Sequence, residues 1–63
     1  MTPRFILRLD LDGDAFQPVA KPEVIRLLRR LADRLEEQGT GYEPGAPILD
    51  ANGNTCGFWE VQA

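Results

Sequence analysis

The sequence predicts a small α+β domain built as a single β-α-β-β layer, with one helix on one face of a three-stranded, mostly antiparallel sheet. Three patterns lead to this prediction: an alternating strand over residues 4–12, an amphipathic helix over residues 22–39 and a hairpin at the end of the chain. All 63 residues then form one domain. A chain of this length buries only about 60% of the surface that it exposes when unfolded, so we expect a small core and self-association.

The first strand is predicted from the stretch RFILRLDLD, which alternates between an apolar and a mixed side. A period of two is typical of a strand with one buried face. Gly13 and Pro18 interrupt the pattern, so residues 12–20 are expected to form a loop from which Phe16 or Val19 packs under the helix. The mixed side carries Ile6, Arg8 and Asp10, and the apolar side carries Phe5, Leu7, Leu9 and Leu11.

The helix is predicted from PEVIRLLRRLADRLEEQG, in which apolar residues recur at helical spacing. Pro22 suits the first helical position, and Glu23 complements the positive end of the helix dipole. Gly39 is placed to cap the C-terminus in a left-handed conformation. The expected core face carries Val24, Leu27, Leu28, Leu31 and Leu35.

The stretch ILDANGNTCGFWEV predicts a hairpin, for which two turns compete. A two-residue type I′ turn at Asn52-Gly53 pairs Leu49 with Cys56. A four-residue type I turn that ends at Gly53, left-handed in a bulge, pairs Leu49 with Thr55 instead. We favour the bulged form, because Asp at the first turn position and Gly at the fourth are typical of it.

The favoured register decides which side chains face the helix. It sends Trp59 and Val61 toward the helix together with Leu49, and Gly57 leaves room for the helix to approach closely. The final strand is expected in the centre of the sheet, in the order 2-3-1, because this path needs only short connections. The opposite face then carries an apolar cluster rimmed by charges, which is typical of a contact surface. This expected dimer or partner interface consists of Ile6, Arg8, Ile48, Cys56, Phe58 and Glu60.

One flank of the helix carries Arg26, Arg30 and Arg34 at every fourth position, with Arg29 alongside. A row of guanidinium groups can bind phosphates or a carboxylate-rich partner, so this flank is the alternative surface, for an anionic partner. Acidic residues interleave with the row, as on an ordinary solvated helix face. The net charge of −3, from 7 Lys and Arg against 10 Asp and Glu, also disfavours nonspecific affinity for nucleic acid.

The stretch LRLDLDGDAF places acidic side chains after the first strand. A strand followed by Asp-x-Asp-Gly resembles the nucleophile motif of haloacid-dehalogenase-type phosphatases, but the resemblance covers only residues 10–13 and the later motifs of that family are absent. The alternate positions of Asp10, Asp12 and Asp14 also resemble the opening of a calcium loop, without the glycine and glutamate that follow in such loops. Weak cation binding there is the alternative to a solvated acidic strand end.

Nucleophilic catalysis has few candidates in this composition. The sequence contains no serine and no histidine, which excludes Ser-His and Cys-His machinery. Cys56 has no histidine to activate it and is expected to be a small apolar packing residue. No glycine-rich phosphate-binding loop is present either. We therefore expect a non-catalytic protein with neither cofactor nor metal site.

Taken together, RFILRLDLD, EVIRLLRRLADRLEEQG and LDANGNTCGFWEV resemble a group of small uncharacterised proteins from bacteriophages, prophages and plasmids. Those proteins typically carry a strand, a helix of the A-D-R-L-E type and a terminal D-x-N-G-N-x-x-G-x-W-E hairpin. The resemblance spans nearly the whole chain and implies an origin in mobile DNA, without a particular mechanism. The matching hairpin positions are Asp50, Asn52, Gly53, Asn54, Gly57, Trp59 and Glu60.

These features predict a protein-interaction domain of phage or mobile-element type, which inhibits or modulates a host protein such as a component of a CRISPR defence complex. The alternative is a homodimeric nucleic-acid-binding or regulatory module that uses the arginine row. The expected partners are an unidentified protein and a second copy of the chain. The unpaired cysteine suits a reducing compartment, and neither a leader nor a membrane span is apparent, so we expect the cytoplasm, that of the bacterial host if a phage encodes the protein.

Overall fold

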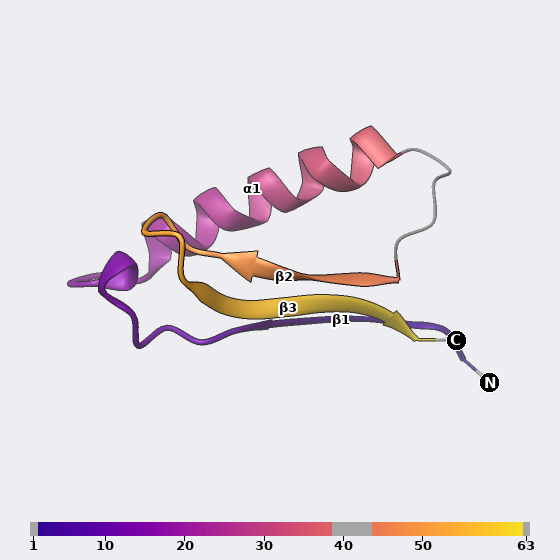
Figure 1. Cartoon of the computed structure of the whole chain (residues 1–63), viewed down its shortest axis with the longest axis horizontal. Coiled ribbons are helices and arrows are strands. Elements are labelled where there is room, and N and C mark those ends of the chain that lie inside the picture. Colours follow the sequence, from indigo (N-terminus) through magenta and orange to yellow (C-terminus); the bar gives the residue numbers. More distant parts are fainter. Residues whose placement is uncertain (1, 39–43, 63) are drawn as a thin grey trace.

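The computed structural model of the chain describes residues 2–38 and 44–62. It contains three strands, a short 3₁₀ turn and one helix that lies above the sheet (Figure 1). The predicted helix cap at Gly39 lies outside the described residues. The elements are β1 (Arg4–Leu9), η1 (Asp14–Phe16), α1 (Lys21–Gln38), β2 (Gly45–Leu49) and β3 (Thr55–Gln62).

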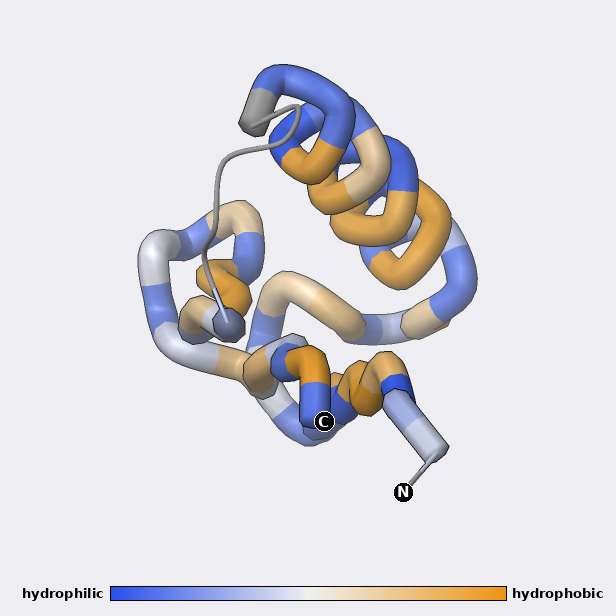
Figure 2. Tube along the Cα trace, turned by 90° about the vertical axis from the view of Figure 1, so that its right-hand side faces the viewer, coloured by the Kyte–Doolittle hydropathy of each residue, from blue (hydrophilic) through white to orange (hydrophobic). Residues whose placement is uncertain are grey.

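The sheet has the order β1-β3-β2, with the final strand in the centre and antiparallel to both neighbours. The predicted α+β fold and the strand order 2-3-1 are therefore confirmed. β1 and β2 run parallel to each other, and α1 connects them on one face of the sheet. Figure 2 shows that the hydrophobic side of α1 faces the strands, as its amphipathic pattern predicts.

The element boundaries follow the sequence signals closely. α1 begins at Lys21, one residue before the predicted start, and Pro22 stays in the first turn, where its missing N–H costs no helical hydrogen bond. The backbone N–H of Val24 donates to the carbonyl oxygen of Ala20 at 3.1 Å, which closes the first turn. β1 ends at Leu9, earlier than the alternation predicts, and the chain then enters the loop that contains η1.

The turn between β2 and β3 takes the bulged form that the sequence favours. Gly53 is left-handed, with a φ of 82°, and its N–H donates to the carbonyl oxygen of Asp50 at 3.0 Å. The Asp50 carboxylate adds two bonds within the turn, because its Oδ1 accepts the N–H groups of Asn52 at 2.9 Å and Asn54 at 3.0 Å. The buried Asp50 side chain therefore orders the turn from inside.

A β-bulge directly after this turn changes which side chains face the helix. Leu49 pairs with Thr55, as the bulged turn requires, whereas Ile48 pairs with Gly57. Cys56 is therefore an extra residue on β3, and beyond such a residue the alternation of faces shifts by one. The prediction that Ile48 and Cys56 face away from the helix was wrong, since both are buried on the helix side. Leu49, which was expected to face the helix, is exposed.

The core lies between α1 and the half of the sheet formed by β2 and β3. η1 contacts α1 and contributes Phe16, which is fully buried, whereas Val19, the other predicted plug, stays exposed. The buried core residues are Phe16, Leu27, Ile48, Cys56 and Trp59, and Leu9, Ala15, Ala20, Val24, Leu31, Leu35 and Ala46 pack against them in part.

The helix leaves the inner face of β1 largely uncovered. Phe5 is 51% exposed, Leu7 37% and Val61 49%, although their register places them on the same face as Trp59. The Phe5 ring stacks on Trp59 with 5.9 Å between ring centroids. Leu28, on the helix flank away from the arginine row, is 43% exposed. The predicted burial of Phe5, Leu7, Leu28 and Val61 was therefore wrong, and we call these four side chains the open apolar residues.

Gly57 is required by a close approach of two strands. A Cβ atom at this position would lie 1.8 Å from the carbonyl oxygen of Arg8 on β1, far inside the contact distance. The sequence suggested that Gly57 makes room for the helix, but it makes room for the β1 backbone. At Gly13, by contrast, a Cβ atom would meet the Asp50 carboxylate at 3.4 Å, close to ordinary contact.

We expect Gly57→Ala to lower the free energy of unfolding by about 2 kcal/mol or more, because the added methyl group must push β1 away from β3. Urea denaturation followed by circular dichroism measures this loss. Gly13→Ala is the matched control and should change the free energy of unfolding by less than about 1 kcal/mol. Equal, small losses in both variants would contradict the close approach of β1 at Gly57.

Candidate functional site

A buried carboxylate joins the start of α1 to the turn between β2 and β3. Glu23 accepts two bonds from Arg26, at 2.7 Å from Nε to Oε1 and at 2.8 Å from Nη2 to Oε2. Its Oε2 also accepts the backbone N–H of Ala51 at 2.8 Å. Glu23 lies in the first turn of α1, where negative charge complements the helix dipole. It therefore holds the N-terminal end of the helix against the hairpin turn.

These bonds favour the charged forms of both side chains. The hydrogen bonds from Arg26 hold the pKa of Glu23 below its ordinary value of 4.5; burial acts in the opposite direction, and the Ala51 N–H supports the lowering. The hydrogen bonds to Glu23 raise the pKa of Arg26. Both groups are therefore charged at neutral pH, and Arg26 binds a carboxylate of its own chain.

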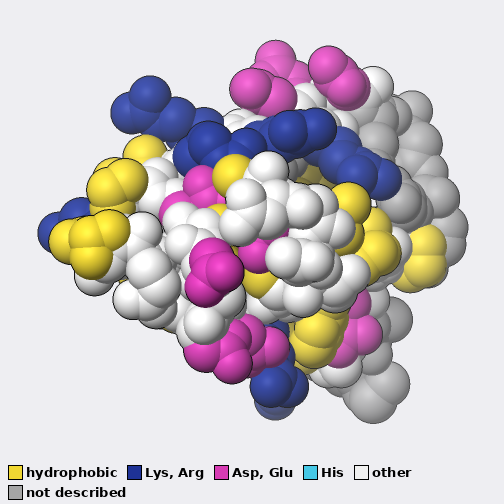
Figure 3. Space-filling view, turned by 60° about the vertical axis from the view of Figure 1, so that its left-hand side comes forward, with side chains coloured by type: hydrophobic (Ala, Val, Ile, Leu, Met, Phe, Trp, Pro, Cys, Tyr) yellow, Lys and Arg dark blue, Asp and Glu magenta, His cyan; other side chains and the backbone are white. Residues whose placement is uncertain are grey.

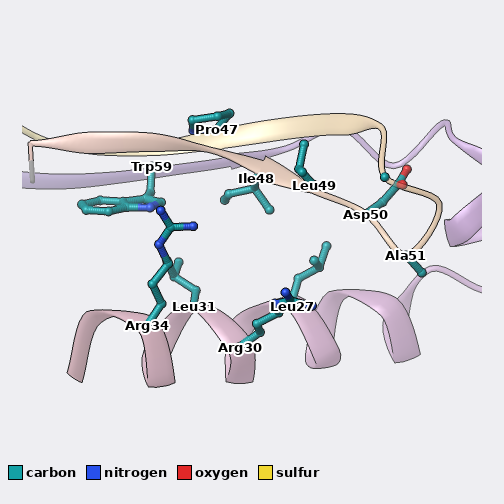
Figure 4. Close-up of a pocket in the computed structure, with 11 residues that line it drawn as sticks. Leu27, Arg30, Leu31, Arg34, Pro47, Ile48, Leu49, Asp50, Ala51 and Trp59 are labelled. Atoms are coloured by element: carbon teal, nitrogen blue, oxygen red, sulfur yellow. The ribbon is translucent and has the colours of Figure 1, made fainter. Parts of the chain in front are cut away.

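α1 and the edge strand β2 border a groove of about 410 Å³ (Figure 4). Leu27 and Leu31 point from the helix toward Ile48 and Trp59, so the floor of the groove is apolar. The guanidinium group of Arg34 points toward the indole ring of Trp59 in Figure 4. We call this space the α1–β2 groove. Its helix side also includes Arg30, and its hairpin side is lined by Pro47, Leu49, Asp50, Ala51 and Gly53.

The structure divides the predicted arginine row. Arg30 and Arg34 border the α1–β2 groove, whereas Arg26 binds Glu23. Arg29 is exposed on the side of the helix that faces away from the sheet. Figure 3 shows Lys and Arg side chains as a dark-blue band across the top of the molecule, where α1 lies, with acidic side chains above it. Only Arg30 and Arg34 of the four predicted residues therefore lie together beside an apolar surface.

The outer face of the sheet keeps four of the six residues predicted for it. Phe58 is 36% exposed there, opposite a charged residue of β1. The loss of two apolar side chains to the core leaves a mixed surface, which is typical of the solvent-facing side of an antiparallel sheet. Of the six predicted residues, those on this face are Ile6, Arg8, Phe58 and Glu60, and those in the core are Ile48 and Cys56.

The acidic side chains after β1 are divided between two places. Asp10 and Asp12 line a pocket of about 590 Å³, whereas Asp14 lies outside it in η1. Asp10 is bonded to Arg8, whose Nε lies 3.3 Å from Oδ1. In the described part of the chain, no group of three or more His, Cys, Asp or Glu side chains is arranged to hold a metal ion. The alternate aspartates therefore do not by themselves form a metal centre.

Cys56 is a free cysteine in the core. Burial raises the pKa of its thiol above the ordinary value of 9.0, and the nearby Asp50 carboxylate adds to this effect. The thiol is therefore protonated at neutral pH, unlike the thiolate of a reactive cysteine. Its predicted role as a small apolar packing residue is confirmed, on the opposite face of the sheet from the one expected.

The groove and the contact between Glu23 and Ala51 were not predicted from the sequence. The spacing of Glu23 and Arg26 is a usable signal, because residues three apart on a helix can form an ion pair. The second partner of Glu23 is a backbone N–H. Nearly every residue type has this group, so the sequence does not indicate which residue donates it. The groove depends on which edge strand lies beside the arginine flank, and the periodicity of α1 does not contain that information.

Comparisons with protein families, with curated proteins and with solved structures find no match to this chain. Within the described residues, no helix is both long and apolar enough to cross a membrane.

We expect Glu23→Gln to lower the stability of the protein at neutral pH, and we expect this loss to shrink as the pH falls. A carboxylate whose pKa is lower in the folded than in the unfolded state stabilises the fold fully above the unfolded value, and its contribution disappears as the pH falls through the folded value. Here that window begins near 4.5 and extends downward. Urea unfolding of both proteins between about pH 7 and pH 3 measures the difference.

Glu37→Gln is the control for this experiment. It removes the same charge from an exposed position near the end of the same helix, so it should change stability little at either pH. If the difference between wild type and Glu23→Gln stayed constant across the pH range, the stabilising role of the Glu23 carboxylate charge would be refuted.

We expect iodoacetamide to modify Cys56 at least about 100-fold more slowly in the folded protein than in the urea-unfolded chain, because the buried thiol is protonated and inaccessible. Mass spectrometry of timed samples measures the rate. Thr55→Cys in a Cys56→Ala background moves the thiol to the adjacent exposed position and should react rapidly. Fast modification of wild-type Cys56 under native conditions would show that the residue is not in the core.

Proposed function

We propose that this chain is a non-catalytic protein-binding domain and that its α1–β2 groove binds an acidic segment of a partner protein. One observation carries the proposal: Arg30 and Arg34 border a groove whose floor is apolar. An acidic segment with an apolar side chain fits both features. Its apolar side chain would cover the half-buried Leu31 and the exposed Leu49, and its carboxylates would meet the guanidinium groups.

The two kinds of contact strengthen each other. Apolar surface that is removed from water contributes about 25 cal/mol per Å². A carboxylate beside such a contact is partly shielded from solvent, so its hydrogen bonds to a guanidinium group are stronger than those of an exposed pair, which contributes only about 0–1 kcal/mol. Arg is also enriched among the residues that dominate binding energies at protein interfaces.

The distribution of charge supports a protein partner over nucleic acid. A phosphate backbone binds to a continuous run of cations, whereas Arg26 already binds Glu23 at 2.7 Å. The exposed side chains of Asp33 and Glu37 add negative charge to the same helix. The alternative function, a homodimeric nucleic-acid-binding or regulatory module, therefore has less support than protein binding.

A role in binding rather than catalysis has two further supports. Cys56, the one thiol of the sequence, is buried and has a raised pKa. The sequence also lacks serine and histidine, which supply the usual nucleophile and base. We therefore include the absence of catalysis in the proposal.

The resemblance to small phage, prophage and plasmid proteins suggests the setting in which this binding takes place. In that setting the partner is a host protein, which the domain inhibits or modulates, as an anti-CRISPR-like factor does to a defence complex. The domain would then work in the cytoplasm of the bacterial host. These statements belong to the proposal and depend on the resemblance, not on the groove.

The binding test uses a fluorescent peptide of alternating glutamate and leucine residues. We expect wild type to bind it and Arg30→Glu to weaken binding about tenfold or more, because the substitution replaces attraction by repulsion at the rim. Arg29→Glu is the matched control, with the same change of charge on the exposed side of the helix, and it should change the affinity less than about threefold. Fluorescence anisotropy measures both effects.

Two further probes separate the alternatives. A peptide of alternating lysine and leucine should not bind, and a DNA duplex should bind only weakly. Salt-sensitive DNA binding that Arg29→Glu and Arg30→Glu weaken equally would favour the nucleic-acid module. No detectable binding of the acidic peptide would count against the proposal. If the peptide binds, wild type and Arg30→Glu become paired baits for the natural partner in a bacterial lysate.

A further inference from the structure

Among the described residues, no strand pairs with the outer edge of β1, so this edge is able to pair with another strand. β1 and β2 are both edge strands, because β3 lies between them. The N–H of Asp10 donates to the carbonyl oxygen of Cys56 at 2.7 Å, so the even-numbered residues of β1 are those that bond to β3. In an antiparallel pair, the alternate residues direct their backbone groups the other way. Phe5, Leu7 and Leu9 therefore direct their N–H and C=O groups to the free edge.

The edge of β2 differs in its backbone donors. The N–H of Val61 donates to the carbonyl oxygen of Pro44 at 2.8 Å, so Gly45 and Pro47 direct their backbone groups outward. Pro47 has no N–H, and proline on an edge strand is a common protection against pairing. β1 contains no proline over Arg4–Leu9. β1 is therefore the edge that is open to another strand.

We propose that β1 pairs antiparallel with β1 of a second copy of the chain, around a two-fold axis at Leu7. Such an interface is isologous, since the same groups of each copy satisfy one another. Leu7 lies opposite Leu7 of the second copy, and Phe5 lies opposite Leu9. All three residues then exchange backbone hydrogen bonds across the interface, and the two sheets become one continuous sheet.

The charges along β1 favour this register over the two registers adjacent to it. With the axis at Leu7, Arg4 lies opposite Asp10 of the second copy, and symmetry repeats this pair. An axis at Ile6 would instead place Arg4 opposite Arg8. An axis at Arg8 would place that arginine opposite itself. Like charges directly opposite each other destabilise a strand pair, so the axis at Leu7 is favoured over both.

The open apolar residues supply the hydrophobic part of this interface. Phe5, Leu7 and Leu28 lie on the helix side of the sheet and are substantially exposed. Pairing places Leu7 against its own copy and Phe5 against Leu9, and it sets the Leu28 flanks of the two helices on one face of the joined sheet. Each Å² of apolar surface removed from water contributes about 25 cal/mol. The α1–β2 groove borders the other edge of the sheet, so this inference does not depend on the proposed peptide binding.

A charge-exchange cycle in sedimentation equilibrium tests the register. We expect wild type to dimerise. Arg4→Asp and Asp10→Arg should each raise the dimer Kd about tenfold, because each substitution places two like charges opposite each other, and the two-fold symmetry repeats this pair. The double variant restores opposite charges and should return the Kd to within about threefold of wild type. Asp14→Arg, an exposed charge change in η1, is the control and should leave the Kd unchanged. All of these positions are exposed, so the variants are expected to fold, which circular dichroism checks.

Phe58→Asp separates this dimer from one formed through the outer sheet face. Phe58 lies on the central strand and outside the β1 edge, so this variant should dimerise like wild type. A dimer that Phe58→Asp disrupts while the charge-exchange cycle has no effect would overturn the β1 interface. Wild-type protein that stays monomeric at every concentration would overturn the dimer itself.

Discussion

The bulge at Cys56 is the constraint on which the rest of the structure depends. β3 is the central strand and pairs with β2 in the hairpin. One extra residue in β3 therefore changes which face of the sheet is occupied by the side chains of both strands near the turn. The bulge turns Ile48 and Cys56 toward α1, where they complete a core around Trp59. It thereby supplies part of the groove floor and removes Ile48 and Cys56 from the outer sheet face, where Phe58 remains.

The contact between Glu23 and Ala51 links the start of α1 to the turn between β2 and β3. With the start of the helix held at this turn, its Arg30 flank lies beside the β2 edge. The same placement leaves the inner face of β1 exposed at Phe5 and Leu7. With the helix in this position, the groove lies on one side of it and the open apolar residues lie on the other.

The two proposed surfaces differ in chemistry and lie at opposite edges of the sheet. The α1–β2 groove offers guanidinium groups above an apolar floor and suits an acidic partner. The β1 edge offers backbone donors and acceptors with complementary charges at its two ends and suits a second copy. One chain can use both at once, and a dimer would carry two grooves. A partner with two acidic segments would then bind with an affinity raised by effective concentration.

The sequence by itself determined the elements, their order and the form of the turn, because each depends on a local pattern: alternation in β1, apolar spacing in α1, and an Asp and a Gly at the ends of the turn. It also contained the arginine row, although not which of its members meet the groove. The faces of Ile48 and Cys56 were decided only by the tertiary structure, because a bulge depends on the pairing of two strands. The same holds for Glu23, whose partner Ala51 lies 28 residues away and contributes only a backbone N–H, a group that every residue type except proline carries.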